Sequence, residues 1–384
     1  MYYSNYMIVK NIISDIENSI VKQQYNESKQ MFKDVGEFIK KKNLLLYGGF
    51  AINLLLPQKQ KFYKKYTLND YDCLSHSAKK DAYELAEYLK KKNYQYVKVR
   101  KAIHDNTFKV FANFIVVADI TQMEKKKFDN LLKIFKEEKS SQMYRYYKED
   151  YKLVPVFMLF SNMHYELARP QSSYYRWEKI LQRLDSLQSI IPNTLIKDTK
   201  KKHCPKKLII SNQIDKFLKK NNIPRVDASV LQQYNVCYYE NGKISILSQN
   251  PLDTVDALKS FLENHDYITK SKKNILYVYN ENDADNIMVK ITIFDTSNDC
   301  FATEYKNKKY IGTPHTVMYF MYEDLLMNAK QVNVQMFEKL LVLEKTFRDK
   351  HLNNILSKQC SGNNHSFASI LKEKWGVPQT LQYF

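Results

Sequence analysis

The sequence predicts an α+β fold, with helices and strands mixed along the chain, built as two halves that share one order of elements. Strand-like apolar segments that end in an aspartate occur at residues 110–121 and 285–297, and a helical pattern precedes each of them. An apolar helix led by a proline follows each segment, at residues 154–170 and 313–330. The repeated order indicates two copies of one structural unit.

The length of 384 residues suits two domains, flanked and joined by shorter segments. We expect residues 1–42 to form helices that pack on a first domain at 43–191. Residues 192–207 are rich in lysine and predict an exposed linker before a second domain at 208–384. The N-terminal helices are predicted from apolar residues near helical spacing, namely Ile8, Ile12, Ile13, Ile16 and Ile20.

The elements of the first domain follow from their patterns. A Gly48–Gly49 turn is expected to open a helix at 50–56, and an amphipathic helix is expected at 79–92 with Ala82, Leu85, Ala86 and Leu89 inward. We expect strands around Asp70–Asp72, at 94–100 and at 110–118, and helices at 154–167 and 174–191. Lys109 and Asn113 alternate with the apolar residues beside them and are candidates to face a ligand.

Three aspartates form the candidate catalytic and metal-binding group. Asp70 and Asp72 are two positions apart on one strand, so their side chains point to the same face. Asp119 follows the apolar run 110–118, and a strand there beside the first would bring all three carboxylates together. Their mutual repulsion requires cations, and oxygen ligands of this kind suit Mg²⁺ or Mn²⁺. Two such ions can activate a hydroxyl nucleophile and stabilise a leaving phosphate.

Gly48 and Gly49 complete this candidate site. Without side chains they let the backbone approach a triphosphate, and the helix that follows offers its N-terminal N–H groups to phosphate. Each motif alone has a simpler interpretation, because a Gly-Gly pair is common in turns and an Asp-x-Asp is common in loops. Asp119 also suits the cap of a following helix. The ordered set of motifs is much more specific than its parts.

Composition agrees with a polyanionic partner without requiring one. The net charge is +19, which suits nucleic acid, but 30 tyrosines and only 7 glycines indicate that an AT-rich genome also raises the lysine content. Basic clusters occur at Lys61–Lys65, Lys90–Lys101 and Lys125–Lys127. We expect these clusters to be partly a track for RNA and partly ordinary surface.

The five cysteines show no Cys-x-x-Cys pair and no metal-ligand spacing, so we expect reduced thiols in a cytosol. Cys73 is expected to pack behind Asp72. No apolar run reaches 18 residues, and the first residues do not resemble a signal peptide. We therefore expect a soluble protein without a membrane segment.

Residues 44–187 resemble the DNA polymerase β-like nucleotidyltransferases, and within them the poly(A) polymerases of large cytoplasmic DNA viruses such as giant viruses, asfarviruses and poxviruses. The matching segments are YGGFAINLLLP (47–57), YTLNDYDCLS (66–75), HDNTFKVFANFIVVADIT (104–121) and ELARPQSSYYRWEKILQRL (166–184). The spacing between Gly49 and Asp70 is longer than the superfamily usually has, and the giant-virus enzymes are similar in this respect.

This resemblance implies a template-independent RNA nucleotidyltransferase that adds AMP from ATP to the 3′ end of mRNA. Asp70 and Asp72 would hold both metal ions, and Asp119 the ion that activates the 3′-hydroxyl. Gly48 and Gly49 would contact the β- and γ-phosphates. The matching segment also carries the basic residues Arg169, Arg176, Lys179 and Arg183.

The last three of these basic residues share one helix face, because they are spaced by three and four positions. One interpretation is that this face, with Arg169, holds the ATP triphosphate opposite the metal ions. The other is a solvated basic face paired with Glu178 and Asp185. The sequence leaves both interpretations open.

The resemblance also implies that the second half is an inactive copy. Its candidate strand, Lys243–Gln249, carries no acid, and no Gly-Gly pair precedes it. Asp295 would correspond to Asp119, but one carboxylate cannot hold two metal ions. Two unrelated α/β domains with similar periodicity are the alternative.

Other activities stay open. A tRNA CCA-adding enzyme or a uridylyltransferase would use the same catalytic residues, and an inactive RNA-binding or processivity subunit is the alternative outside the enzymes. A homodimer or a processivity partner is also left open. The resemblance implies a location in the host cytoplasm, in a viral factory or virion.

Overall fold

The computed structural model divides into two compact units, Met1–Leu159 and Phe160–Phe384, and each is described by itself. The division lies within one helix, upstream of the boundary expected at residue 191. The predicted linker lies, apart from its first two residues at most, outside the described part of the chain. The structure describes residues 2–63, 66–102, 106–137, 147–148, 150–192, 209–236, 242–280, 283–327 and 334–363.

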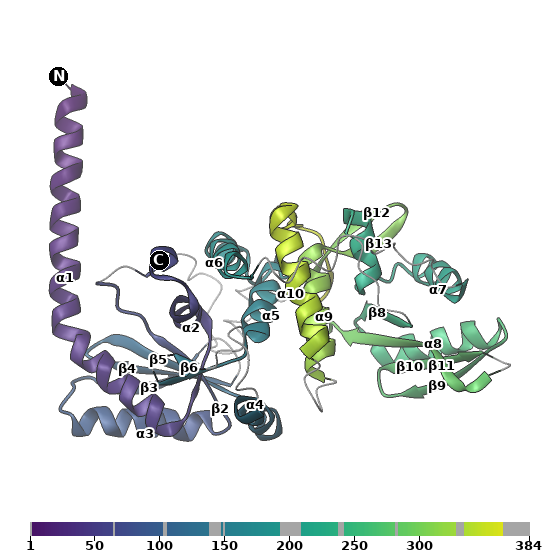
Figure 1. Cartoon of the computed structure of the whole chain (residues 1–384), viewed down its shortest axis with the longest axis horizontal. Coiled ribbons are helices and arrows are strands. Elements are labelled where there is room, and N and C mark those ends of the chain that lie inside the picture. Colours follow the sequence, from purple (N-terminus) through teal and green to yellow (C-terminus); the bar gives the residue numbers. More distant parts are fainter. Residues whose placement is uncertain are drawn as a thin grey trace, which may run out of the picture. The chain divides into compact units, whose positions relative to one another are not determined.

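The first unit is a mixed sheet with helices packed against it (Figure 1). Its helices are α1 (Tyr2–Lys42), α2 (Gly48–Leu55), α3 (Ala78–Lys91), α4 (Lys125–Glu137) and the start of α5 (Val156–Leu167), with a 3₁₀ turn at Gln58–Gln60. Its strands are β1 (Leu45–Leu46), β2 (Tyr71–Ser75), β3 (Lys98–Lys101), β4 (Thr107–Ala112), β5 (Ile115–Gln122), β6 (Tyr147–Lys148) and β7 (Tyr151–Leu153).

The strands of this unit lie in the order β3-β4-β5-β2-β1-β7-β6. Strand β2 lies at the centre, parallel to β5 on one side and antiparallel to β1 on the other. Helix α3 forms as expected, with Ala82, Leu85, Ala86 and Leu89 buried on the inward face. The central strands are therefore held on both edges, which fixes the positions of the residues they carry.

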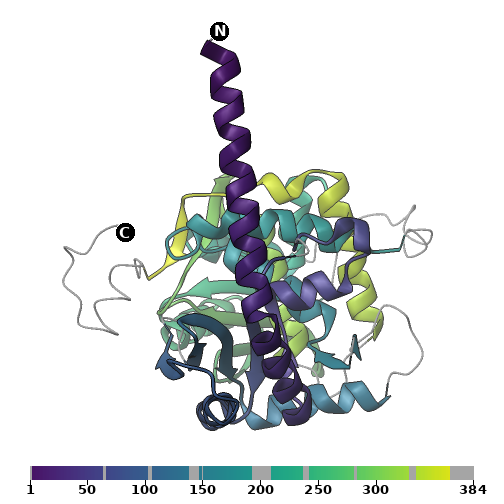
Figure 2. The same ribbon diagram turned by 90° about the vertical axis from the view of Figure 1, so that its left-hand side faces the viewer.

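Helix α1 differs from the expectation for residues 1–42. It is one continuous helix, and only its C-terminal half packs on the unit, through Met31, Val35 and Ile39. The apolar residues of its N-terminal half are about half exposed, for example Ile13 at 50% and Ile16 at 54%. Figure 2 shows this half standing away from the sheet. The periodicity correctly indicated a helix, but it did not reveal that this apolar face lacks a cover within the described chain.

The expected single strand at 110–118 is instead a hairpin. Strand β4 ends at Ala112, and β5 begins at Ile115. The two residues between them, Asn113 and Phe114, have φ values of 49° and 64°, as a two-residue hairpin turn requires. The turn places Asn113 at the tip, where its side-chain oxygen accepts a hydrogen bond from the backbone of Gln95, 2.8 Å away.

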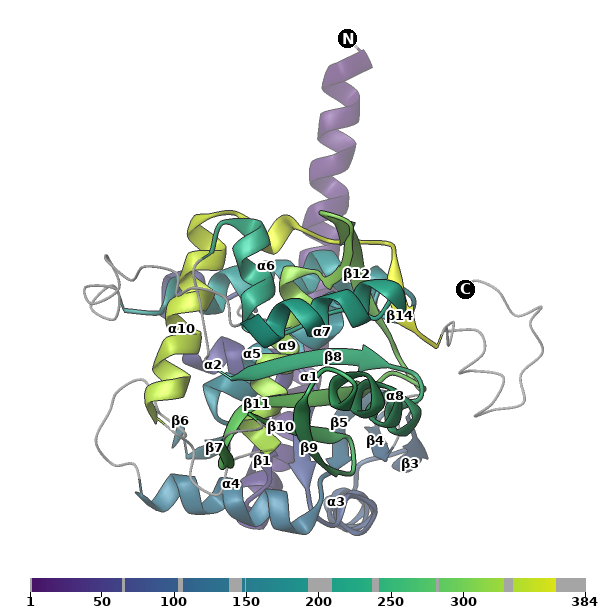
Figure 3. The same ribbon diagram turned by 90° about the vertical axis from the view of Figure 1, so that its right-hand side faces the viewer.

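The second unit contains a four-stranded sheet, β8-β11-β10-β9, and a three-stranded sheet, β13-β12-β14 (Figure 3). Its strands are β8 (Lys243–Ser248), β9 (Tyr267–Lys272), β10 (Ile275–Asn280), β11 (Asp283–Asp295), β12 (Cys300–Lys306), β13 (Lys309–Gly312) and β14 (Cys360–Gly362). Its helices are α6 (Trp177–Ser189), α7 (Ile209–Lys220), α8 (Pro251–Glu263), α9 (Pro314–Met327) and α10 (Val334–Asp349), with 3₁₀ turns at Tyr174–Arg176, Ala228–Tyr234 and Leu352–Asn354.

A buried polar cluster lies among the helices of the second unit. Nδ1 of His164 lies 2.8 Å from Nδ1 of His315, and Nε2 of His164 lies 2.8 Å from Glu344. Glu344 also accepts hydrogen bonds from Tyr322 and Gln188. The two histidines and Glu344 are fully buried, so their polar atoms depend on one another instead of water.

The expectation of reduced thiols is wrong for two cysteines. Cys300 and Cys360 form a disulfide between β12 and β14. Cys73 is a buried free thiol, as expected, and Cys204 and Cys237 lie outside the described residues. Among the described helices, we find none whose length and apolar character would let it span a membrane.

Candidate active site

The three predicted aspartates meet at the junction of β2 and β5. Asp70 directly precedes β2, and Asp72 is the second residue of that strand. In the parallel pairing of the two strands, Asp72 lies opposite Asp119. Asp119 therefore lies inside a strand, which excludes the interpretation that it caps a following helix.

The three carboxylate groups share one small volume. One oxygen from each of Asp70, Asp72 and Asp119 lies within 4.8 Å of the others. Asp70 is exposed, and the other two are partly buried, so the cluster is open on one side. Hard, negatively charged oxygens in this arrangement suit Mg²⁺ or Mn²⁺. The identity of an ion does not follow from these oxygens alone.

Gly48 brings the N-terminus of α2 against this cluster. A β-carbon at Gly48 would lie 2.2 Å from Oδ2 of Asp72, so no side chain fits at this position. The φ of +67° at Gly48 also favours glycine. Gly49 follows as a buried helical residue, and α2 begins two residues earlier than expected. The first N–H groups of α2 thus lie beside the carboxylates, in a place suited to phosphate.

Lys109 supplies the positive charge nearest to Asp119. The two residues face each other in the β4–β5 pair, and Nζ of Lys109 lies 2.5 Å from Oδ2 of Asp119. The expectation that Lys109 faces the site is therefore confirmed, whereas Asn113 lies at the hairpin tip. An ion pair between neighbouring strands is visible in the sequence only once the hairpin turn has been located.

A chain of hydroxyl groups lies beside the carboxylates. The hydroxyl of Tyr47 lies 2.9 Å from Oγ1 of Thr121, which lies 2.9 Å from Oγ1 of Thr107. Burial, together with the negative charge of Asp72, raises the pKa of Tyr47, so this phenol stays neutral. Burial likewise raises the pKa of Cys73 well above its usual value, and Asp72 adds to the effect. Cys73 is therefore a packed thiol and supplies no thiolate ligand.

Tyr71 fixes β2 from behind. Its hydroxyl donates to the backbone oxygen of Phe32 in α1 at 3.1 Å and lies 3.2 Å from the hydroxyl of Tyr151. Since neighbouring residues of a strand point to opposite faces, this anchor holds Asp70 and Asp72 toward the site.

The predicted basic residues lie in the second unit. The guanidinium of Arg169 is packed on the ring of Tyr165, 3.6 Å from its centroid, and pairs with Asp299 at 3.1 Å. Arg176 pairs with Glu166 at 2.8 Å. Lys179 lies in α6, whereas Arg183 of that helix is buried. Asp185 pairs with Arg348, so the expected partners of a solvated face are engaged elsewhere. A role for Arg169, Arg176 and Lys179 in nucleotide binding stays a prediction.

Comparisons with known proteins agree with this geometry. Residues 33–173 match the family model described as the poly(A) polymerase catalytic subunit. A curated African swine fever virus protein named as a candidate catalytic subunit of this kind is 31% identical over 159 residues, which are 41% of this chain and 32% of that protein. A protein of the same description from Acanthamoeba polyphaga mimivirus is 27% identical over 203 residues, which are 50% and 33% of the two chains.

The chain spans about a third of the length of the curated relatives that it matches. A solved structure, that of the Megavirus polyadenylate synthase, is similar in fold with a TM-score of 0.69 and 16% identity. That match covers 98% of this chain and 84% of the solved chain. The predicted mixed α/β fold is thus confirmed, and through residues 33–173 the chain belongs with the family of poly(A) polymerase catalytic subunits.

Proposed function

We propose that this chain is a template-independent poly(A) polymerase that transfers AMP from ATP to the 3′ end of mRNA. The observation that carries the proposal is the cluster of Asp70, Asp72 and Asp119 beside the glycine-led start of α2. Carboxylates next to backbone N–H groups provide sites for cations and for phosphate in one place. The family match over residues 33–173 supports the choice of AMP transfer to RNA.

In the proposed reaction, the 3′-hydroxyl oxygen of the RNA forms a bond to the α-phosphorus of ATP. The bond from that phosphorus to the bridging oxygen breaks, and pyrophosphate leaves with the bond's electron pair. The N–H groups of Gly48 and Gly49 orient the β- and γ-phosphates. Tyr47 and Thr121 keep β2 and β5 in register beneath the reacting groups, because their hydroxyls are hydrogen-bonded.

Asp70 and Asp72 would hold two divalent ions, and Asp119 would hold the one nearer to the 3′-hydroxyl. The donor set fits Mg²⁺ or Mn²⁺, since it consists of carboxylate oxygens within 4.8 Å of one another. When bound, the ions supply activation of the hydroxyl and neutralise charge on the leaving pyrophosphate.

The activity is tested by incubating the full chain with a labelled oligoribonucleotide, Mg²⁺ or Mn²⁺ and each nucleoside triphosphate separately. We expect a ladder of products with ATP alone. Addition of two cytidines from CTP and one adenosine from ATP would instead indicate a CCA-adding enzyme, and extension with UTP a uridylyltransferase. Binding of RNA without extension by any nucleotide would leave an inactive RNA-binding subunit.

We further propose that a second copy of this chain docks on the N-terminal half of α1, in preference to a separate processivity partner. Val9, Ile13, Ile16 and Ile20 are spaced by four, three and four positions, as in the seam of a coiled coil, and are 49–54% exposed. No charged residue interrupts this seam.

Charge complementarity supports a second copy in the antiparallel direction. Lys10 and Glu17 take equivalent positions beside the seam, one heptad apart. In an antiparallel pair, Lys10 of one helix would face Glu17 of the other, and interhelical pairs at such positions set orientation. An isolated helical extension of this kind is marginal in water, which gives the pairing a driving force.

The relatives are proteins of large DNA viruses. We propose the host cytoplasm, in a viral factory or a virion, as the location of this chain. Fractionation of infected cells with an antibody against the chain tests this location.

A further inference from the structure

The second unit repeats the strand framework around the active site. In the first unit, Leu46 pairs antiparallel with Cys73 of β2 and parallel with Leu153 of β7. In the second unit, Arg225 bridges Ile246 of β8 in the antiparallel sense and Ile311 of β13 in the parallel sense. Strand β11 then lies parallel beside β8, as β5 lies beside β2.

Individual hydrogen bonds reproduce the same register. The N–H of Tyr47 donates to the backbone oxygen of Asp72 at 3.0 Å, and the N–H of Val226 donates to that of Ser245 at 2.8 Å. Val226 therefore takes the place of Tyr47. The next residues, Asp227 and Ala228, take the places of the two glycines.

A serine at the end of each strand gives independent support. The hydroxyl oxygen of Ser75 accepts from the N–H two residues on at 2.8 Å, and that of Ser248 does the same at 3.0 Å. Each hydroxyl also bonds to a side chain six residues on, Asp81 in the first unit and Thr254 in the second. Ser248 thus corresponds to Ser75.

With this register, the three acids of the active site correspond to Lys243, Ser245 and Thr292. Counting back from Ser248, Lys243 takes the place of Asp70, and Ser245 that of Asp72. Thr292 lies opposite Ser245, as Asp119 lies opposite Asp72. The expected match of Asp295 to Asp119 is therefore wrong. Asp295 lies opposite Ser248, because β11 continues for three residues beyond the corresponding position.

Lysine side chains bring positive charge to the place where the first unit gathers negative charge. Lys243 and Lys290 lie opposite each other in the β8–β11 pair. Their ammonium groups lie 3.1 and 3.5 Å from the carboxylate of Asp324, whose side chain is only 13% exposed. Hydroxyl groups and ammonium groups do not form a site for Mg²⁺, which prefers charged oxygen ligands.

The space at this position is also too small for a nucleotide. A cavity of about 20 Å³ lies there, lined by Asp227, Lys243, Ser245 and Asp324 together with apolar residues. This volume holds about one water molecule, whereas small-molecule sites usually have some hundreds of Å³.

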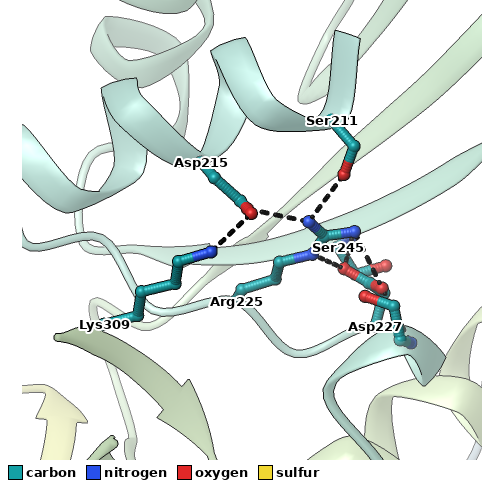
Figure 4. A network of polar contacts seen from close by, with 7 residues as sticks. Ser211, Asp215, Arg225, Asp227, Ser245 and Lys309 are labelled. Carbon is teal, nitrogen blue, oxygen red and sulfur yellow. Dashed lines mark hydrogen bonds and ion pairs between the residues drawn. The ribbon is translucent and has the colours of Figure 1, made fainter. Parts of the chain in front are cut away.

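The corresponding phosphate position is occupied by a carboxylate. Asp227 accepts a hydrogen bond from the N–H of Ser229 at 3.0 Å and pairs with Arg225. Arg225 also contacts Asp215 at 2.8 Å and Ser211 at 3.0 Å, and Lys309 completes the network (Figure 4). A negative side chain here would repel a triphosphate.

We propose that the second unit is a nucleotidyltransferase-like fold in which lysine–aspartate and arginine–aspartate pairs have replaced the metal and triphosphate sites. This half then binds neither a catalytic metal ion nor ATP, and its former site is a structural centre that needs no metal. The inference rests on the proposed function in one respect, since it takes the aspartates of the first unit as the metal ligands.

The first test counts metal ions on the full chain by electron paramagnetic resonance of Mn²⁺. We expect up to two tightly bound ions in the native chain and none when Asp70, Asp72 and Asp119 are all changed to asparagine. Tight Mn²⁺ left in the folded triple variant would overturn the inference. Loss of binding at the three aspartates but no extension of RNA would count against the proposed function alone, and no binding by the native chain would count against the proposed metal site.

The second test asks whether the pairs are structural. Lys243→Met and Asp324→Asn should each lower the Tm, by about 2–4 °C, and the double variant should lose less than the sum. The losses should be equal in EDTA and in Mg²⁺. Lys259→Met, which removes an exposed pair with Glu263 on α8, is the control and should have little effect. Additive losses, or losses that Mg²⁺ reverses, would contradict a metal-independent centre.

Discussion

The ammonium group of Lys109 lies 2.5 Å from Oδ2 of Asp119, across the β4–β5 pair. This contact supplies a positive charge to a cluster of three carboxylates, so in the absence of metal it reduces their repulsion. A bound metal ion would compete with it for Asp119.

We predict that Lys109→Met lowers the Tm in EDTA and increases the gain in Tm on adding Mn²⁺. The side chain is 34% exposed, so the pair contributes about 1 kcal/mol or less. Thermal unfolding in EDTA and in Mn²⁺ measures both effects. Lys98→Met, an exposed lysine on β3 of the same sheet, should change neither. An unchanged Mn²⁺ effect in Lys109→Met would show that the ammonium does not compete with metal.

The second prediction concerns the three aspartates. Asp70→Ala, Asp72→Ala and Asp119→Ala should each reduce primer extension by about 10³-fold or more, which corresponds to about 4 kcal/mol of transition-state stabilisation. Stability should hold or rise, because each change removes one charge from a repulsive group. Primer extension and thermal unfolding of the same preparations measure the two effects.

Asp295→Ala is the matched control for these variants. Asp295 ends β11 and accepts a hydrogen bond from the N–H of Ser297, so its loss should leave the chemical step unchanged. A folded Asp295 variant that binds RNA but transfers no AMP would place the active site in the second unit.

Local patterns predicted the acids well because strand periodicity and the Gly-Gly turn are properties of neighbouring residues. The hairpin was missed because Asn113 and Phe114 interrupt an apolar run without a typical turn sequence. The contact between His164 and Glu344 and the disulfide of Cys300 join residues far apart in the chain. No local pattern contains such pairings. The error at Asp295 has the same origin, since register is set by the partner strand.

The third prediction separates nucleotide contacts from RNA contacts. If the basic surface tracks RNA, log K for a single-stranded primer should fall with log[salt] by about 0.7 for each phosphate contacted. Charge reversal at Lys125–Lys127, in the first turn of α4, should reduce this slope. Arg176→Ala and Lys179→Ala should raise the KM for ATP and leave the slope nearly unchanged. Normal ATP kinetics in both variants would remove this helix from the nucleotide site.

The fourth prediction concerns pH. Burial, with the nearby charge of His164, lowers the pKa of His315 to about 3. Unfolding returns His315 to an ordinary pKa near 6.5, so the unfolded chain binds the proton more readily. Stability is therefore present above pH 6.5 and is lost as the pH falls toward 3, at up to about 1.4 kcal/mol per pH unit. Urea unfolding at pH 7.5, 6 and 5 measures the loss.

His315→Gln should unfold more easily at pH 7.5, because Nε2 of His315 bonds to the backbone oxygen of Asn353. Its stability should nevertheless depend less on pH than that of the native chain. His265→Gln, on an exposed histidine, should keep the native dependence. Parallel pH curves for the native chain and His315→Gln would assign the effect to the other titratable groups of the cluster, His164, Glu344 and Tyr322.

The fifth prediction concerns the seam on α1. Changing both Ile13 and Ile16 to lysine should convert a self-associated chain into a monomer, because charges in the seam cannot be buried without partners. Light scattering after size-exclusion chromatography measures the mass over a range of concentrations. Asn11→Lys and Asn18→Lys, on the same helix outside the seam, provide the control. A native chain that stays monomeric at all concentrations would refute self-association.

The missing side chain at Gly48 has a consequence for how the two halves can change over generations. A β-carbon there would collide with Asp72, so position 48 can vary only after that acid has been lost. Position 227 holds an aspartate opposite Ser245, as this order of events requires. Restoring Asp at position 245 alone would then meet a side chain and its bound arginine. Decay of such a site is easy to enter by single steps and hard to reverse by them.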